Sequence, residues 1–123
     1  MPSKKTSRSS AVIGLGVDLA EVARVRSLAL RSPGFLARVF TKGELAYAAS
    51  SKNKYERLAA RFAVKEAVIK ALDAKDLPLL SIEVENTASG RPLVTVKGRP
   101  GAKLMVSISH TSKYACAAVI AFA

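Results

Sequence analysis

Glu66 and Lys70 are two charged side chains in a segment that is otherwise suited to burial. Residues 61–72 predict a helix whose alanine, valine and isoleucine side chains occupy most of its circumference, which is typical of a helix packed among other elements. Glu66 and Lys70 share one narrow polar strip of that helix. An exposed pair at this spacing would contribute only ~0.2–0.5 kcal/mol, whereas burying two charges costs several kcal/mol per ion. The pattern is compatible with a structural ion pair or with a carboxylate that serves a functional site.

Asp18 is a second candidate carboxylate. Residues 11–18 predict a strand, and Gly14 and Gly16 fall on the same face as Asp18, where they would let a backbone or a ligand come close. On spacing alone, however, we expect Asp18 and Glu21 to form a capping box that opens a helix over residues 20–30. A dinucleotide-binding glycine motif is excluded because its third glycine would fall at Leu19.

Histidine and cysteine chemistry are restricted by single occurrences. His110 is the only histidine, and it lies in a turn, where a solvated side chain is the usual outcome. Cys116 is the only cysteine, and it is expected to be a small buried core residue. These counts exclude a site built from several histidines and argue against zinc or thiol chemistry.

The elements that must position these residues change type along the chain. A short helical turn is expected at Phe35–Phe40, a capping box at Thr41 and Glu44 opens the next helix, and a long helix runs over 55–73 before Pro78. After Pro78 the apolar pattern alternates with period two. It predicts four strands joined as an antiparallel meander, over 80–85, 93–96, 104–109 and 114–122. The fold class is therefore α+β, with a long buried helix packed on a mainly antiparallel sheet.

The composition indicates one folded domain with an anionic partner. The chain has 123 residues, and we read 11–123 as a single domain preceded by a disordered basic arm or cloning remnant at 1–10. The net charge is +11, and only three of the basic residues lie in the arm. No apolar segment of the sequence is close to the length of a membrane span, which needs about 18 consecutive apolar residues. No secretory signal is visible either, so a cytoplasmic protein is expected. The anionic partner could be nucleic acid, a phosphorylated small molecule or an acidic protein.

Four separated motifs, in collinear order, resemble one family. Taken together they are similar to holo-acyl-carrier-protein synthase, the small bacterial class of 4′-phosphopantetheinyl transferases, and the resemblance covers about residues 11–123. The motifs are Gly14-Leu15-Gly16-Val17-Asp18, Arg61-Phe62-Ala63-Val64-Lys65-Glu66-Ala67 with Lys70, Gly90-Arg91-Pro92, and Ser107-Ile108-Ser109-His110-Thr111.

The resemblance implies a Mg²⁺-dependent reaction. Such enzymes move the phosphopantetheine arm of coenzyme A to a serine of acyl carrier protein, which supports fatty acid biosynthesis, and release adenosine 3′,5′-bisphosphate. Asp18 and Glu66 match the metal ligands, and Lys70 would place a second positive charge on the diphosphate of coenzyme A. The base that removes the serine proton, a metal-bound water or Glu66, is left open. A homotrimer with active sites at the subunit interfaces is also implied.

The same matching assigns two binding surfaces. Arg24 matches a position that meets the acidic acyl carrier protein, and Arg31 shares its helix face. The coenzyme A pocket would be lined by Arg61, Lys70, Gly90, Arg91, Pro92, His110 and Thr111. One departure affects this pocket: where the family has a Gly-Thr-Gly loop, this chain has residues 73–76, Asp-Ala-Lys-Asp.

Two other classes of protein fit the sequence less well. A basic nucleic-acid-binding module would be expected to show a recognisable RNA- or DNA-binding signature, or aromatic residues interleaved with arginines, and neither is present. A catalytically silent trimeric scaffold would be expected to lose Asp18, Glu66 or Lys70, and all three are present.

Overall fold

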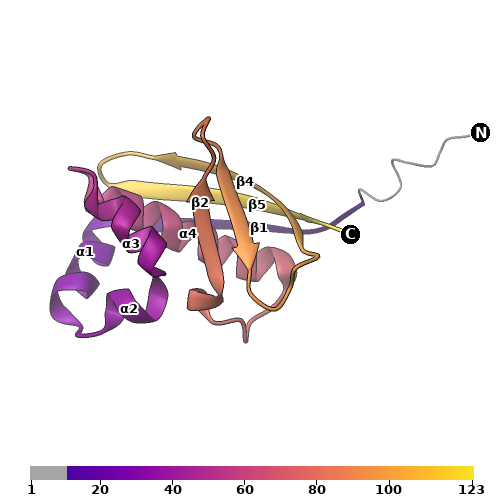
Figure 1. Ribbon diagram of the computed structural model, residues 1–123, viewed down its shortest axis with the longest axis horizontal. Coiled ribbons are helices and arrows are strands. Elements are labelled where there is room, and N and C mark those ends of the chain that lie inside the picture. Colours follow the sequence, from indigo (N-terminus) through magenta and orange to yellow (C-terminus); the bar gives the residue numbers. More distant parts are fainter. Residues whose placement is uncertain (1–10) are drawn as a thin grey trace, which may run out of the picture.

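The computed structural model describes residues 11–123, so the arm predicted at 1–10 lies outside the described residues. Within the described part, no helix is long and apolar enough to cross a membrane. The elements follow one another in the order shown in Figure 1: β1 (Val12–Glu21), α1 (Val22–Arg31), α2 (Phe35–Val39), α3 (Lys42–Ala49), α4 (Lys54–Leu72), a 3₁₀ turn (Leu79–Ser81), β2 (Ile82–Asn86), β3 (Pro92–Val96), β4 (Lys103–His110) and β5 (Tyr114–Phe122).

The strands form two separate antiparallel sheets around α4. The larger sheet has the order β1-β5-β4, and the smaller one is the β2-β3 hairpin. The helix α4 packs against β1 and β5 on one side, and α1, α3 and β2 contact its other sides (Figure 1). The predicted α+β class, with a long helix on an antiparallel sheet, is confirmed.

The predicted four-stranded meander is wrong, because β3 and β4 do not pair in a ladder. Instead β1 pairs with β5 along its length, from Val12 opposite Phe122 to Glu21 opposite Tyr114. The almost continuous apolar run of β5 is the reason, since a strand of this composition is suited to the centre of a sheet. In a four-stranded meander β5 would be the last strand, so it would pair only with β4 and its other edge would have no partner strand.

Glycines on β1 let α4 approach the sheet at backbone distance. A Cβ atom added at Gly14 or Gly16 would lie 1.7 Å from the carbonyl oxygen of Ala71 or 1.9 Å from that of Ala67. The expected close approach on the face that also carries Asp18 is thus confirmed, and the approaching backbone is that of α4. The facing side chains of β5 are small as well, and they are buried: Ala115, Ala117, Val119 and Ala121.

The fully buried charge on α4 is Lys65, not Glu66 or Lys70. The Lys65 ammonium contacts Glu44 Oε1 at 2.7 Å and donates to the carbonyl oxygens of Val39 (2.6 Å) and Leu79 (3.1 Å). Burial lowers the pKa of Lys65, and the hydrogen bond and charge of Glu44 oppose this shift. The prediction placed Lys70 in a buried strip, but its side chain is 54% exposed.

The two predicted capping boxes have opposite outcomes. The Thr41–Glu44 box is present, because the Thr41 hydroxyl accepts from the Glu44 amide and the Glu44 carboxylate accepts from the Thr41 amide. The Asp18–Glu21 box is absent: the N-cap of α1 is Glu21, and its side chain makes no capping bond. Pairing with β5 continues through Glu21, so the backbone of Asp18 stays in the strand.

Cys116 is half-buried rather than part of the core. It stands opposite Leu19 and Ser109, on the face of the larger sheet that points away from α4. Its neighbours Ala115 and Ala117 are the buried ones. A continuous apolar run does not reveal which alternate positions face the helix, and this explains the error.

Asp73 ends α4 in a conformation that favours glycine. Its φ is +51°, and the following amide, that of Ala74, donates to the Ile69 carbonyl oxygen, so the helix closes with a left-handed residue. Asp73→Gly should therefore raise the free energy of unfolding by about 0.5–1 kcal/mol, because it removes the Cβ penalty. Urea denaturation would measure this. Asp76→Gly is the matched control, because the φ of Asp76 is not positive, and an equal gain there would contradict the explanation.

Candidate active site

Asp18, Glu66 and Lys70 come together where β1 crosses α4. The Lys70 ammonium donates to the Val17 carbonyl oxygen (2.8 Å) and lies 3.4 Å from Asp18 Oδ1. Lys70 thus pairs with Asp18 across the two elements, and no ion pair joins it to Glu66 within the described residues. Asp18 and Glu66 both line a cavity of about 190 Å³, together with Arg24 and Phe62. The close approach of α4 to β1 at Gly16 places these side chains side by side.

The electrostatics of this cavity favour a bound cation. Partial burial raises the pKa of Glu66, the negative charge of Asp18 raises it further, and Lys70 lowers it. Two carboxylates are therefore held near each other with only partial compensation. Within residues 11–123, no cluster of three or more His, Cys, Asp or Glu could enclose a metal. A cation here would need water or substrate oxygens as its remaining ligands, and Mg²⁺ is commonly bound in this way.

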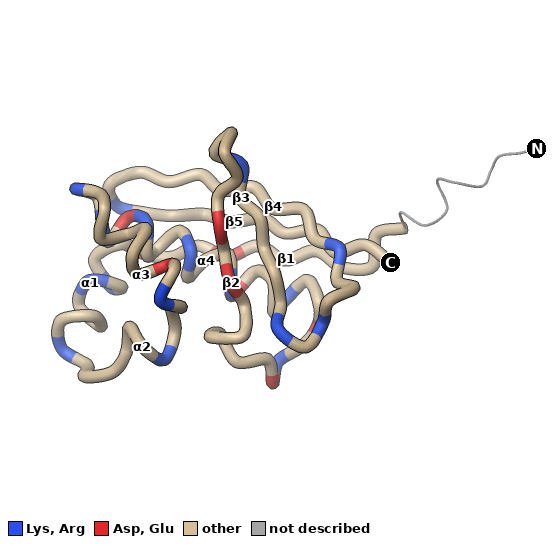
Figure 2. Tube along the Cα trace, in the orientation of Figure 1, with Lys and Arg blue, Asp and Glu red and all other residues tan. Residues whose placement is uncertain are grey.

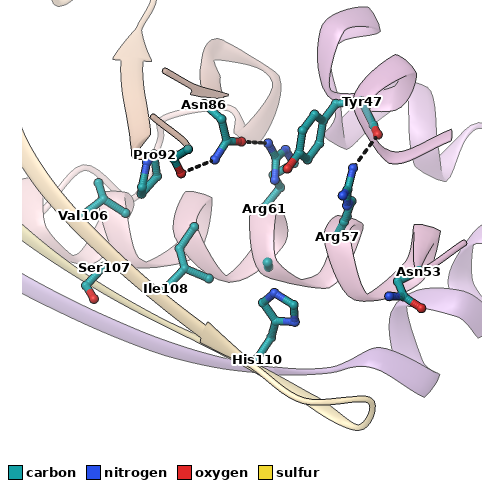
Figure 3. A pocket seen from close by; sticks show the side chains of 12 residues that line it. Tyr47, Asn53, Arg57, Arg61, Asn86, Pro92, Val106, Ser107, Ile108 and His110 are labelled. Atoms are coloured by element: carbon teal, nitrogen blue, oxygen red, sulfur yellow. Dashed lines mark hydrogen bonds between the residues drawn. The ribbon is translucent and has the colours of Figure 1, made fainter. Parts of the chain in front are cut away.

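A second, larger cavity is lined by Arg61. It measures about 460 Å³ and lies between α3, α4, the β2-β3 hairpin and the end of β4 (Figure 3). Four of the residues predicted to bind coenzyme A line it, namely Arg61, Gly90, Pro92 and His110. Arg91 and Thr111, which were also predicted, are not among its lining residues, although each is next in the chain to one that is. Lys70 lies instead with Asp18.

Arg61 is held rigidly in this cavity. It is only 4% exposed; its Nη2 donates to Asn86 Oδ1 at 2.6 Å, and its guanidinium lies 4.0 Å from the centre of the Tyr47 ring. Burial lowers the pKa of Arg61. Its Nε atom is buried and makes no hydrogen bond to the described residues. A buried guanidinium that lines a cavity and forms no ion pair with the described residues is suited to an anionic ligand.

Outside the four sequence motifs, this cavity has four polar residues that sequence reasoning missed. Asn86 accepts from Arg61 and donates to the Gly90 carbonyl oxygen (2.9 Å), so one amide joins the hairpin turn to α4 (Figure 3). Arg57 could have been found, because it precedes Arg61 by one helical turn. The other three, Tyr47, Asn53 and Asn86, reach the cavity from separate segments and carry no local signal.

His110 is not an isolated solvated side chain. Its Nδ1 lies 3.0 Å from Glu56 Oε1, on the first turn of α4, and the ring lines the larger cavity. This contact ties the end of β4 to α4. The interpretation of His110 as a pocket residue therefore agrees better with its position than the solvated alternative does.

The two arginines predicted to meet a carrier protein occupy different hollows. Arg24 lines the small cavity with Asp18 and Glu66, whereas Arg31 lines a shallower one with Leu30 and Ser112. Both lie on α1, which also carries Arg26 and has no acidic residue (Figure 2). A partner that touches this helix would therefore reach the carboxylate cavity directly.

Comparison with known proteins identifies the family of the chain. The family model of the 4′-phosphopantetheinyl transferase superfamily matches residues 14–119. The holo-[acyl-carrier-protein] synthase of Thermodesulfovibrio yellowstonii is 47% identical over 109 residues, covering 87% of this chain and 96% of that protein. The Bacillus subtilis enzyme of the same name is 38% identical over 114 residues, covering 89% and 94%.

Solved structures extend the comparison to the fold. The Bacillus anthracis holo-(acyl-carrier-protein) synthase in complex with CoA (3′,5′-ADP) has a TM-score of 0.79 at 31% identity, covering 90% of this chain and 96% of that one. The Helicobacter pylori enzyme in complex with coenzyme A has a TM-score of 0.76 at 30% identity, covering 87% and 98%. The chain belongs to the 4′-phosphopantetheinyl transferase superfamily and, within it, to the family of holo-[acyl-carrier-protein] synthases.

Proposed function

We propose that this chain transfers the 4′-phosphopantetheine group of coenzyme A to a serine of apo acyl carrier protein and releases adenosine 3′,5′-bisphosphate. The protein would thus support fatty acid biosynthesis. The observation that carries the proposal is the meeting of Asp18, Glu66 and Lys70 at the crossing of β1 and α4. These residues provide two carboxylates, which can hold a metal ion, and one ammonium group. Together they are suited to the transfer of a phosphoryl group from a diphosphate.

Asp18 and Glu66 would hold Mg²⁺. Burial and, after it, the charge of Asp18 raise the pKa of Glu66, and a divalent cation would stabilise the ionised form of both carboxylates. When bound, the metal would neutralise charge that develops on the phosphate oxygens. Lys70 is oriented by the Val17 carbonyl oxygen and would contribute a second positive charge to the diphosphate.

The larger cavity would bind the nucleotide part of coenzyme A. Arg61, Gly90, Pro92 and His110 line it, and no acidic side chain does. Coenzyme A has to reach from this cavity to the carboxylates, yet within one chain the two sets of residues line different cavities. A neighbouring copy that brings its carboxylate cavity to the nucleotide cavity would unite them.

We therefore propose a homotrimer with active sites between copies. The face of the larger sheet that points away from α4 has no cover within the described chain. It carries exposed apolar side chains at Ile13, Leu15, Val17, Leu19 and Met105, which are between 49% and 64% exposed. A continuous apolar sheet face of this kind is typical of a surface buried by association. Second copies of the chain would cover it.

Leu15→Glu should dissociate this assembly and reduce transfer by about 100-fold or more, because a charge in an apolar interface is left without a partner. Leu15 is 64% exposed in the single chain, so the substitution should leave each copy folded. Sedimentation equilibrium would give the mass, and transfer would be followed in parallel. Leu80→Glu is the matched control, an exposed leucine outside this sheet. A Leu15→Glu protein with wild-type mass and activity would contradict the proposed interface.

We also propose that α1 receives the acidic carrier protein through Arg24 and Arg31. Both are basic residues of α1, and Arg24 borders the carboxylate cavity. Opposite charge on the partner would raise the association rate and make it sensitive to salt.

The deciding experiment is the intact mass of apo acyl carrier protein after incubation with this protein, coenzyme A and Mg²⁺. We expect a gain of one phosphopantetheine that is lost when EDTA is present. A carrier that stays unmodified here, while a known transferase modifies it, would refute the proposed activity and favour a scaffold without catalytic function.

A further inference from the structure

Two arginines in the larger cavity stack on one tyrosine. The guanidinium carbons of Arg57 and Arg61 lie 4.3 Å and 4.0 Å from the centre of the Tyr47 ring, and Figure 3 shows the ring beside both groups. Arg57 also donates from Nη1 to the Tyr47 carbonyl oxygen at 3.3 Å. Tyr47 thus orients two cations that follow each other by one turn of α4.

These two cations have no carboxylate partner. Within residues 11–123, neither Arg57 nor Arg61 forms an ion pair, and every residue that lines the cavity is neutral or basic. Arg61 Nε is buried without a hydrogen bond to the described residues. Two neighbouring guanidinium groups repel each other, and a dianion placed between their free donors would relieve that repulsion.

Coenzyme A offers two kinds of anion. One is the diphosphate, which the proposed function places at Asp18, Glu66 and Lys70. The other is the phosphate monoester on the 3′ position of the ribose, which is a dianion near neutral pH. Because the proposed function places the diphosphate at Asp18, Glu66 and Lys70, the anion that remains to be bound in the cavity with Arg57 and Arg61 is the 3′-phosphate monoester.

We propose that Arg57, oriented by Tyr47, is a specificity-determining residue that recognises the 3′-phosphate of coenzyme A. This inference rests on the proposed function. It adds to the predicted coenzyme A residues two that no family motif in this chain includes. Its consequence is a preference for coenzyme A over 3′-dephospho-coenzyme A that depends on Arg57.

The test compares two nucleotides that differ only in this phosphate. Calorimetry with the full chain and Mg²⁺ would measure the affinity for 3′,5′-ADP and for 5′-AMP. We expect wild type to prefer 3′,5′-ADP, and Arg57→Gln to reduce the ratio of the two affinities by about 10- to 100-fold, which is the range for a lost charged hydrogen bond. Arg57→Lys should restore the ratio only in part, because an ammonium lacks the planar face that stacks on Tyr47.

Arg99→Gln is the matched control for charge alone. Arg99 lies in the turn between β3 and β4 and does not line this cavity, so its loss should leave the ratio as in wild type. The inference is overturned if wild type binds both nucleotides equally, or if Arg57→Gln weakens both by the same factor. A structural role for Arg57 would produce the latter result.

A transfer assay separates this inference from the function on which it rests. Coenzyme A and 3′-dephospho-coenzyme A would each be offered with apo acyl carrier protein, and the ratio of their kcat/KM values should fall in Arg57→Gln as the affinity ratio does. Equal use of both donors by wild type would refute the inference and leave the transferase activity in place. Transfer from neither donor would refute the proposed function.

Discussion

Glu66→Gln should reduce phosphopantetheine transfer by about 10³-fold or more at saturating Mg²⁺. The amide keeps the size of the side chain but removes one of the two anionic oxygen donors, and a metal contributes several kcal/mol to charge stabilisation in reactions of this kind. Glu21 also lines the cavity but is not one of the proposed metal ligands, so Asp18 would be the only proposed ligand that remains. The rate of mass gain of the carrier protein measures the effect. Glu85→Gln, at an exposed position on β2, is the matched control.

The same substitution should not destabilise the fold. The pKa of Glu66 is raised in the folded chain, chiefly by burial and then by Asp18, so the folded state holds its proton more tightly than the unfolded state does. Ionised Glu66 therefore opposes folding: the penalty is absent below the ordinary glutamate pKa, grows as pH rises towards the raised value, and is complete above it.

Without metal, Glu66→Gln should consequently be at least as stable as wild type at neutral pH, and any gain should vanish in acid. Thermal unfolding between pH 4 and pH 8 in EDTA would show this. Normal turnover by Glu66→Gln would remove Glu66 from the metal site, and loss of activity together with unfolding would show a structural role instead.

Gly16→Ala should cost about 3 kcal/mol or more of the free energy of unfolding and should also abolish transfer. The new Cβ would lie 1.9 Å from the Ala67 carbonyl oxygen, which is backbone and cannot rotate away. The helix would have to move off β1, and overpacking of this kind is among the most destabilising of substitutions. The same movement would separate Glu66 from Asp18.

Gly101→Ala provides the comparison for this effect. Nothing lies within 4 Å of a Cβ atom at Gly101, and its φ is not positive, so alanine there should be tolerated. Urea denaturation of both variants, with transfer measured on the folded fraction, would test the claim. Equal stability of the two proteins would mean that α4 and β1 can separate without loss.

The sequence predicted the features that depend on neighbours along the chain. The long helix ends within a residue or two of its expected limits, and the Thr41–Glu44 box forms as the spacing indicated. The glycines at 14 and 16 indicated that a backbone or a ligand comes close on the face that carries Asp18, and the backbone of α4 does so. Periodicity and local hydrogen bonding are sufficient for such predictions.

Features that depend on tertiary packing could not be predicted from periodicity and local hydrogen bonding. The spacing of Asp18 and Glu21 fits a capping box, but long-range pairing with β5 decides in favour of a strand. Tyr47 and Asn86 enter the larger cavity from α3 and from the end of β2, and nothing near them in the chain indicates a shared ligand. Their roles become visible only when the elements that carry them are placed around α4.

Lys65 shows the same limit most clearly. Lys65 and Glu66 are adjacent, and the helical pattern alone did not show which charge would be enclosed. Glu44 decides this from 21 positions away: its carboxylate contacts Lys65 and accepts from the amides of Thr41 and Val84. A residue that seemed to serve only a local cap therefore joins α3, α4 and β2.

The enclosed Lys65–Glu44 pair also constrains how this lineage can evolve. Losing one member would leave the other charge buried alone, at a cost of about 3–5 kcal/mol, out of a total stability of roughly 5–15 kcal/mol for a domain of this size. Replacing both by apolar side chains together could be nearly neutral. Selection would therefore remove most variants in which only Lys65 or only Glu44 is replaced, although the double replacement is viable. Among descendants, the two residues should both be retained or both be replaced.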